Sequence, residues 1–143
     1  MKRILMLLVL SIFIGGCSKD DNDDSINTNK ALIEKVWEHS KNNPEGFTLD
    51  LETMKPVKFG ISVAYLETQN SFDKPGLEKA IEHALKNQKV VGGWLNSDDD
   101  LYYFDSVKIF ENSELDEALE FAKRNKQVAI FDLTNLKEIR VQP

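Results

Sequence analysis

A short apolar segment that ends at the only cysteine, Cys17, divides the sequence into a leader and a region that can fold. Residues 4–14 are apolar except for Ser11, and Lys2 and Arg3 give the segment a positive start. A helix needs about 20 apolar residues to cross the hydrocarbon core of a membrane, so this run is too short for a permanent span. The pattern is typical of a secretory signal, which predicts that residues 1–16 are removed as a signal peptide.

The residues that end the leader, Ile14-Gly15-Gly16-Cys17, resemble the lipobox of bacterial lipoproteins. In that family a dedicated peptidase cuts just before a cysteine whose thiol already carries a diacylglyceryl group. The resemblance implies that Cys17 is lipidated and holds the chain at a membrane, since two or more acyl chains give stable anchoring. Ile14 stands where leucine is commoner, and the alternative is an ordinary cleaved signal followed by a free cysteine.

A polar and acidic run, residues 18–25, follows the cysteine. It has no apolar side chain before Ile26 with which to bury surface, so we predict that residues 17–30 form a flexible tether. The run is also similar to the acidic export tag of surface-exposed lipoproteins in some Gram-negative bacteria. We therefore expect an outer membrane lipoprotein that faces outward, with retention on the periplasmic side and a plain spacer as the alternatives.

The charge and the cysteine count limit what residues 31–143 can do. Without the leader, the chain has 16 basic and 24 acidic residues, a net charge of −8. Nucleic acid and anionic lipid bind to basic surfaces, so we expect neither as a partner beyond the lipid on Cys17. With that cysteine consumed, no disulfide can form, and an apolar core alone must hold what has the length of a single domain.

Three helices are predicted from apolar residues at helical spacing. The first begins behind Thr28 or Asn29 as its cap and ends near Pro44. The second has Pro75 in its first turn and ends near residue 87. The third begins at Ser113, which forms a capping-box-like pattern with Asp116, and ends near residue 126.

Strands are predicted where apolar and polar residues alternate. Residues 47–51 and 59–65 show this pattern, and residues 90–95 and 101–110 form a hairpin. Residues 128–133 are nearly all apolar, which predicts a strand covered on both faces, and a turn then leads into a last strand. The fold class expected is α+β, with three helices packed on a mainly antiparallel sheet in a single small domain.

An acidic segment in the predicted hairpin has part of the pattern of a calcium loop. Asn96, Asp98 and Asp100 have the alternating spacing that opens an EF-hand. The position that needs glycine is Leu101, and the position that needs a bidentate glutamate is Val107, so the match fails. No zinc-binding spacing of histidine or cysteine occurs. We expect no metal and no cofactor, and interpret the segment as an acidic hairpin tip with at most weak calcium binding.

Catalytic candidates follow from the side chains that titrate near neutral pH. These are His39 and His83, and His83 falls outside the apolar stripe of its helix, so it should face solvent or an adjoining groove. If there is a catalytic site, we expect His83 to act there with Thr68, Gln69 and Asp105. Surface histidines without any catalytic role are the alternative.

The glycines of the predicted hairpin suggest a ligand groove. Gly92 and Gly93 lie beside Trp94 and face a strand with Tyr103, which would let a small ligand bind against Trp94 and Tyr103. The alternative is that the glycines only relieve crowding between aromatic side chains in a twisted hairpin.

Short blocks between residues 45 and 140 suggest a family; they are Gly46-Phe47-Thr48, Gly93-Trp94, Tyr103-Phe104-Asp105 and residues 125–133. They resemble a domain found at the ends of phage head-morphogenesis and mobile-element proteins. The resemblance implies a toxin-like or nuclease-like role but carries no catalytic motif. That family usually lacks a lipid anchor, a departure that argues against an intracellular role here.

These observations lead to hypotheses from different classes of function. The first is a non-enzymatic, surface-anchored lipoprotein that presents a small domain to an unknown protein partner. The second is a small hydrolase or nuclease-like enzyme, which predicts that His83, Thr68, Gln69 and Asp105 converge on a common point. A third, capture of a small ligand by Trp94 and Tyr103, requires a concave pocket at the hairpin.

Overall fold

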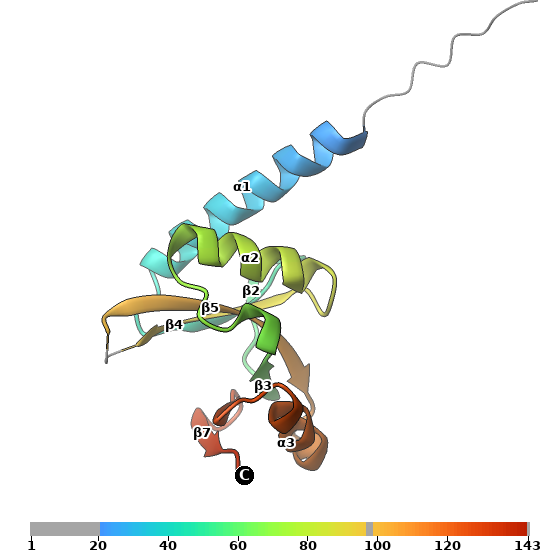
Figure 1. The fold of residues 1–143 in the computed structure, drawn as a ribbon, viewed down its shortest axis with the longest axis vertical. Helices are drawn as coiled ribbons and strands as arrows, with labels where there is room; N and C mark the ends of the chain where they lie inside the picture. The colour runs from blue at the N-terminus through green and yellow to red at the C-terminus, as the bar shows by residue number, and fades with distance from the viewer. Residues whose placement is uncertain (1–20, 97–98, 143) are drawn as a thin grey trace, which may run out of the picture.

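The computed structural model describes residues 21–96 and 99–142, and the side chains from residue 29 onward (Figure 1). The helices in this part of the chain are α1 (Asp21–Lys41), α2 (Asp73–Leu85), α3 (Leu115–Arg124) and the short 3-10 helices η1 (Leu66–Thr68) and η2 (Asn112–Glu114). The strands are β1 (Phe47–Asp50), β2 (Lys55–Pro56), β3 (Ile61–Ala64), β4 (Val90–Asn96), β5 (Leu101–Phe110), β6 (Ala129–Asp132) and β7 (Lys137–Arg140).

The strands form one sheet in the order β2-β1-β4-β5-β3-β6-β7, and each neighbouring pair is antiparallel. The predicted α+β class and the three helices on an antiparallel sheet are therefore confirmed. Strand β5 pairs with β4 through residues 101–106 and with β3, on its other edge, through residues 107–110. This stagger divides the domain into two lobes that share one strand.

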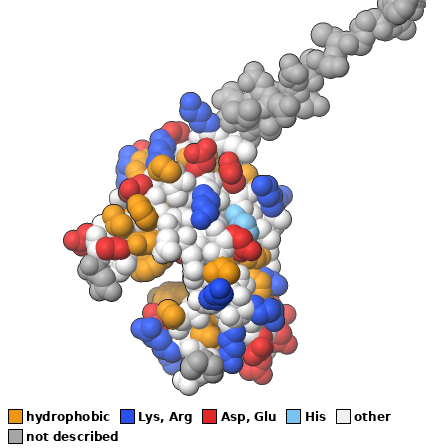
Figure 2. All heavy atoms as spheres, in the orientation of Figure 1, with side chains coloured by type: hydrophobic (Ala, Val, Ile, Leu, Met, Phe, Trp, Pro, Cys, Tyr) orange, Lys and Arg blue, Asp and Glu red, His pale blue; other side chains and the backbone are white. Residues whose placement is uncertain are grey.

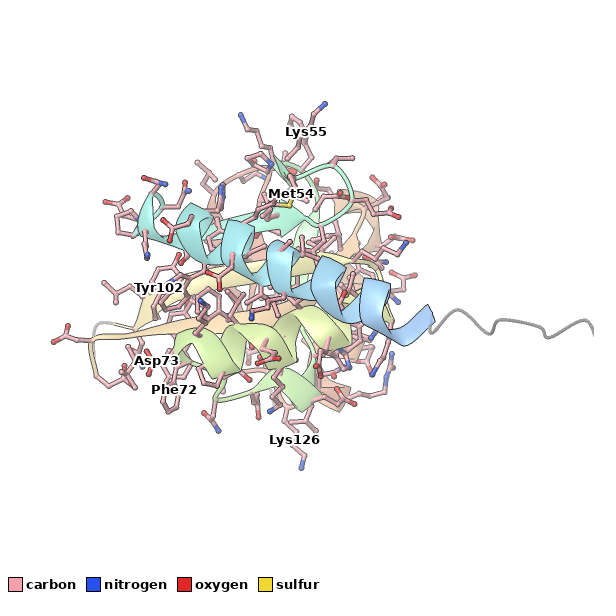
Figure 3. The ribbon with its side chains drawn as sticks, turned by 90° about the horizontal axis from the view of Figure 1, so that it is seen from above. Met54, Lys55, Phe72, Asp73, Tyr102 and Lys126 are labelled. Atoms are coloured by element: carbon pink, nitrogen blue, oxygen red, sulfur yellow. The ribbon has the colours of Figure 1, made fainter. Side chains whose placement is uncertain are left out.

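The larger lobe consists of α1, α2, β1, β2, β4 and residues 101–106 of β5. Helices α1 and α2 run side by side over one face of its sheet (Figures 1 and 3). Apolar residues at i, i+3 and i+4 along α2 face the strands and are buried, as predicted, namely Leu77, Ala80, Ile81 and Ala84. They pack with Val36 of α1 against Leu49, Val91 and Phe104 of the sheet.

The smaller lobe consists of α3, β3, β6, β7 and residues 107–110 of β5. Its core is made by Ile61, Val63, Phe110, Ala118, Ala122 and Ile130. Tyr65 lies between the lobes, because its ring centroid is 4.8 Å from that of His83 on α2 and 5.2 Å from that of Phe121 on α3.

Two predicted helix starts are wrong. Helix α1 begins at Asp21 rather than behind Thr28 or Asn29, so residues 21–30 of the predicted tether belong to it. Nucleation is the costly step in helix formation, whereas extending an existing helix gains one hydrogen bond for each residue that is fixed. The packed turns that follow residue 30 supply the nucleus. At the third helix, the capping box is formed by Glu111 and Glu114 at η2, before the predicted pair of Ser113 and Asp116.

Strand β6 is covered on one face only, which corrects the prediction for residues 128–133. Ile130 is buried under α3, whereas Phe131, which points the other way, is 41% exposed. A continuous apolar run does not show how many layers pack on a strand. Among the described residues, one layer packs on β6.

Pro56 lies in β2 at the edge of the sheet, as its missing N–H requires. Within the described part of the chain, no helix is long and apolar enough to span a membrane.

Candidate functional site

Three aromatic side chains form a row across the β4–β5 hairpin. Trp94 lies directly opposite Tyr103 in the ladder, and Phe72, just before α2, forms an isolated bridge with Tyr103 on its other side. The rings of Trp94 and Tyr103 are stacked, with centroids 5.2 Å apart, and Phe72 meets Tyr103 edge-on at 5.8 Å. Neighbouring residues of a strand point to opposite faces, and Phe104 points into the core, so this aromatic row lies on the face opposite the helices.

The aromatic row is accessible to solvent. Trp94 is 45% exposed and Phe72 is 40% exposed. Hydrophobic side chains gather at this end of the hairpin beside acidic ones (Figure 2), and Phe72 and Asp73 are found there at the start of α2 (Figure 3). Exposed apolar patches with a polar rim mark interaction surfaces in soluble domains.

A hydrogen bond and close aromatic packing fix the hairpin beneath the aromatic row. The hydroxyl of Tyr102 donates a hydrogen bond to the backbone oxygen of Asn43 at 2.7 Å, which joins the hairpin to the end of α1. A Cβ atom on Gly93 would lie 2.6 Å from a ring carbon of Phe47 and 2.8 Å from one of Tyr102. Gly93 therefore makes room for two aromatic rings on the helix side, as the crowding interpretation of the glycines predicts.

Two carboxylates accept hydrogen bonds from the polar groups of the aromatic row. The indole Nε1 of Trp94 donates to Asp105 at 3.3 Å, and the hydroxyl of Tyr103 donates to Asp99 at 2.7 Å. Burial raises the pKa of Asp105 to about 6, only partly offset by hydrogen bonds from Trp94 and Thr68 and by the charge of Lys79. At Asp99, the hydrogen bond from Tyr103 lowers the pKa of the carboxyl. Both rings therefore lie against acidic groups.

The structure brings some of the catalytic candidates together and separates others. Thr68 is buried; its hydroxyl accepts a hydrogen bond from the backbone N–H of Ser106 at 3.1 Å and also bonds Asp105. His83 instead packs on the ring of Tyr65, and its Nε2 lies 3.9 Å from a carboxylate oxygen of Glu67. Thr68 and Asp105 are thus neighbours, but the contacts of His83 are with other residues.

The remaining candidates, Gln69 and His39, make contacts that stabilise the fold. The backbone N–H of Gln69 donates to the carbonyl of Leu66 at 3.1 Å, which closes η1. The ring of His39 meets the ring of Phe47 edge-on at 4.9 Å. In the part of the chain that the structure describes, no group of three or more histidine, cysteine or acidic side chains could hold a metal ion. Cys17 and Asp98 lie outside the described residues.

A cavity of about 340 Å³ lies beside the aromatic row, around the start of α2. It is lined by Asn70, Ser71, Phe72, Asp73, Pro75, Gly76 and Lys79. The predicted ligand groove comprised Trp94 and Tyr103 but not Phe72. An aromatic side chain in the polar stretch before Pro75 was the signal for Phe72 in the sequence. Only Phe72 belongs to both the cavity and the aromatic row.

Comparison with protein-family models, with curated proteins and with solved structures finds no match for this chain.

Proposed function

We propose that this chain is a surface-anchored lipoprotein whose α+β domain binds a protein partner through the aromatic row Phe72, Tyr103 and Trp94. The observation that carries the proposal is the exposure of Phe72 and Trp94, whose rings flank that of Tyr103, on a hairpin whose Tyr102 is bonded to Asn43. Tryptophan and tyrosine are enriched among the residues that dominate binding energy at protein interfaces. A surface that is already ordered loses little conformational entropy when a partner docks.

The anchor in this proposal is supported by the sequence. The apolar leader, the two small residues before Cys17 and the acidic run after it fit lipid attachment followed by display at the outer membrane. A durable tether at a surface suits a binding domain, because it keeps the aromatic row available to partners that approach from outside.

The surroundings of the candidate residues favour binding over hydrolysis. Asp105, with a pKa of about 6, has the perturbed ionisation seen in many active sites. However, the hydroxyl of Thr68 is buried and already bonded, and His83 contacts Tyr65 and Glu67. A general base, a nucleophile and an open position for substrate do not meet at one point among these residues.

The anchor is tested by metabolic fatty-acid labelling and protease shaving of intact cells that express the wild type or Cys17→Ala. We expect labelled wild-type protein that is lost on shaving, and unlabelled variant. Labelled protein that resists shaving would place the domain on the periplasmic side. A wild type without label would refute lipidation.

The binding surface is tested by cross-linking in intact cells, followed by recovery of the protein and identification of its partners. We expect a partner that is recovered with the wild type and lost with Trp94→Ala. The matched control is Phe59→Ala, because Phe59 is 74% exposed but belongs to the segment before β3. Equal recovery with all three proteins would contradict the proposed role of the aromatic row.

A further inference from the structure

We infer that the partner's segment that docks on the aromatic row is basic, and that it lays an arginine or lysine side chain over the face of Trp94 that is turned away from Tyr103. The inference rests on the proposed function and adds the chemistry of the partner. It follows from the charges that surround the rings and from the atoms that the rings leave open.

Acidic side chains surround the aromatic row. Asp99, Asp100 and Asp105 belong to the hairpin, and Asp73 follows Phe72 at the start of α2. The six salt bridges in the described part of the chain lie elsewhere and involve none of these four acids. Lys79 is the one basic side chain that lines the adjoining cavity, and its charge acts on Asp105. The surface is therefore negative and complements a cationic partner.

Trp94, whose inner face is stacked on Tyr103, offers a cation its outer ring face rather than its polar atom. The N–H of Trp94 and the O–H of Tyr103 already donate to carboxylates. A hydrogen bond to a carboxylate polarises its donor, which adds negative potential to the face of the ring. A cation over a ring face is attracted by that potential, and tryptophan is the strongest of the aromatic side chains in this role.

A second copy of this chain fits the same surface poorly. A symmetric dimer would place identical patches against each other, which would bring two sets of acidic side chains together. A neutral or acidic partner would remove water from these carboxylates without giving them a counter-charge, and that desolvation opposes binding. A basic segment supplies the counter-charge and the cation in one contact.

The inference predicts that affinity depends on pH through Asp105. The groups that face this carboxylate are the indole of Trp94 from β4, the hydroxyl of Thr68 from η1 and the ammonium of Lys79 from α2. A bound cation favours the ionised carboxylate, whose pKa in the free protein is about 6. Affinity should therefore fall between pH 7.5 and pH 5.5, as Asp105 takes up a proton in the free protein.

The test uses the full chain, purified from membranes in detergent, and three labelled peptides of equal length: octa-arginine, octa-glutamate and an uncharged glycine-serine peptide. Binding is measured by fluorescence anisotropy at pH 7.5 and pH 5.5. We expect octa-arginine alone to bind. Trp94→Leu should weaken its binding about tenfold, and Trp94→Phe should weaken it less because a ring face is kept.

The charge of Asp105 is tested against a matched control. Asp105→Asn should weaken octa-arginine binding at least about threefold at pH 7.5 and remove most of the pH dependence. Glu117→Gln makes the same change in net charge on the exposed side of α3, and it should alter affinity less than about twofold. Thermal unfolding of each variant confirms that it is folded.

Three outcomes would overturn the inference. Equal weakening by Asp105→Asn and Glu117→Gln would show attraction by net charge without a site. Octa-arginine that binds no tighter than the other two peptides would exclude a basic segment, and octa-arginine binding that Trp94→Leu leaves unchanged would exclude the ring face as its site. In either case a partner still lost with Trp94→Ala in cells would leave the proposed function standing.

Discussion

The two lobes share strand β5 but are stabilised in different ways. In the larger lobe, ten buried core residues lie between a pair of helices and the sheet. Among the described residues, six buried side chains form the core of the smaller lobe, two of them alanines on α3, and α3 covers it. Hydrophobic burial scales with the apolar area removed from water, so the smaller lobe gains much less stability from its core.

Polar contacts supplement the core of the smaller lobe. The carboxylate of Asp132 accepts hydrogen bonds from the backbone N–H groups of Thr134 and Asn135, at 2.9 and 3.0 Å, and from the side chain of Asn112 at 3.2 Å. The hydroxyl of Thr134 in turn accepts from the N–H of Gly60 at 2.9 Å. Three segments of the chain are thereby joined at one turn. A lobe too small for a large apolar core can thus be ordered by a bonded turn.

The largest difference between the lobes is expected from the two phenylalanines of β5. Phe104 is fully buried between Trp37 and Tyr102, whose ring centroids lie 6.0 and 5.2 Å from its own. Phe104→Ala should reduce the free energy of unfolding by about 4 kcal/mol because a large cavity is left. Phe110→Ala, in the smaller core, should cost less, about 3 kcal/mol. Urea denaturation measures both, and a reversed order would show that the smaller lobe dominates stability.

The bonded turn gives the second prediction, with a matched control in the larger lobe. Asp132→Ala should lower Tm by on the order of 5 °C, because the turn at Thr134 and Asn135 loses its acceptor and Asn112 loses its partner. Asp50→Ala removes a similar turn, in which the carboxylate accepts only from Glu52 and Thr53, so Tm should fall less. An equal fall in both variants would contradict the special role of the turn at Asp132.

The effect of Asp132 should also depend on pH in a defined direction. The side chain and backbone of Asn135 are the main cause that lowers the pKa of Asp132 below its ordinary value of 3.8. A lowered carboxyl pKa adds stability above the unfolded value, and this stability is lost as pH falls through the folded value. The difference in Tm between wild type and Asp132→Ala should therefore shrink below about pH 4.

A pair of glycines tests how tightly the larger lobe is packed. Gly93→Ala forces a methyl group against the rings of Phe47 and Tyr102 and should cost about 2 kcal/mol of stability. A Cβ atom at Gly92 would meet its nearest neighbour, a methyl of Val107, at 3.4 Å. Gly92→Ala should therefore change stability by less than about 1 kcal/mol. Alanine loses less backbone entropy on folding than glycine does, and this gain offsets the closer contact with Val107. Chemical denaturation of both variants provides the comparison.

Local pattern predicted most elements of both lobes, though not the start of α1 or strand β2, and it did not predict their arrangement. The buried stripe of α2, with Leu77 and Ile81, follows from helical spacing, and the β4–β5 hairpin follows from two strand patterns around an acidic tip. The division of β5 between β4 and β3 leaves no local signal, because pairing on two edges is a long-range property. The exposed face of β6 was missed for the same reason.

In the candidate site, too, some contacts could be predicted from the sequence and others could not. Trp94 and Tyr103 lie opposite each other in the ladder of the hairpin, which two adjacent predicted strands made the expected pairing. Phe72 joins them through a bridge between residues far apart in the sequence, which periodicity does not detect. His83 was placed outside its apolar stripe, but its contact with Tyr65 depends on how η1 passes between the lobes.

The smallest expected effect has the opposite sign and concerns Asp105, in the larger lobe. Its pKa is raised from 3.8 to about 6, chiefly by burial, so the ionised form destabilises the folded state. This loss is fully present above pH 6, shrinks as pH falls towards 3.8, and vanishes below that value, where the carboxyl becomes protonated in both states. Asp105→Asn should therefore raise the free energy of unfolding by about 1–2 kcal/mol at pH 7.5, with little change at pH 4.

Urea denaturation at both pH values measures the effect of Asp105→Asn. Asp99→Asn is the control, because the pKa of Asp99 is lowered and the loss of its charge should not stabilise the protein. A variant at Asp105 less stable than the wild type at pH 7.5 would mean that the bond to Trp94 outweighs the cost of burying the charge.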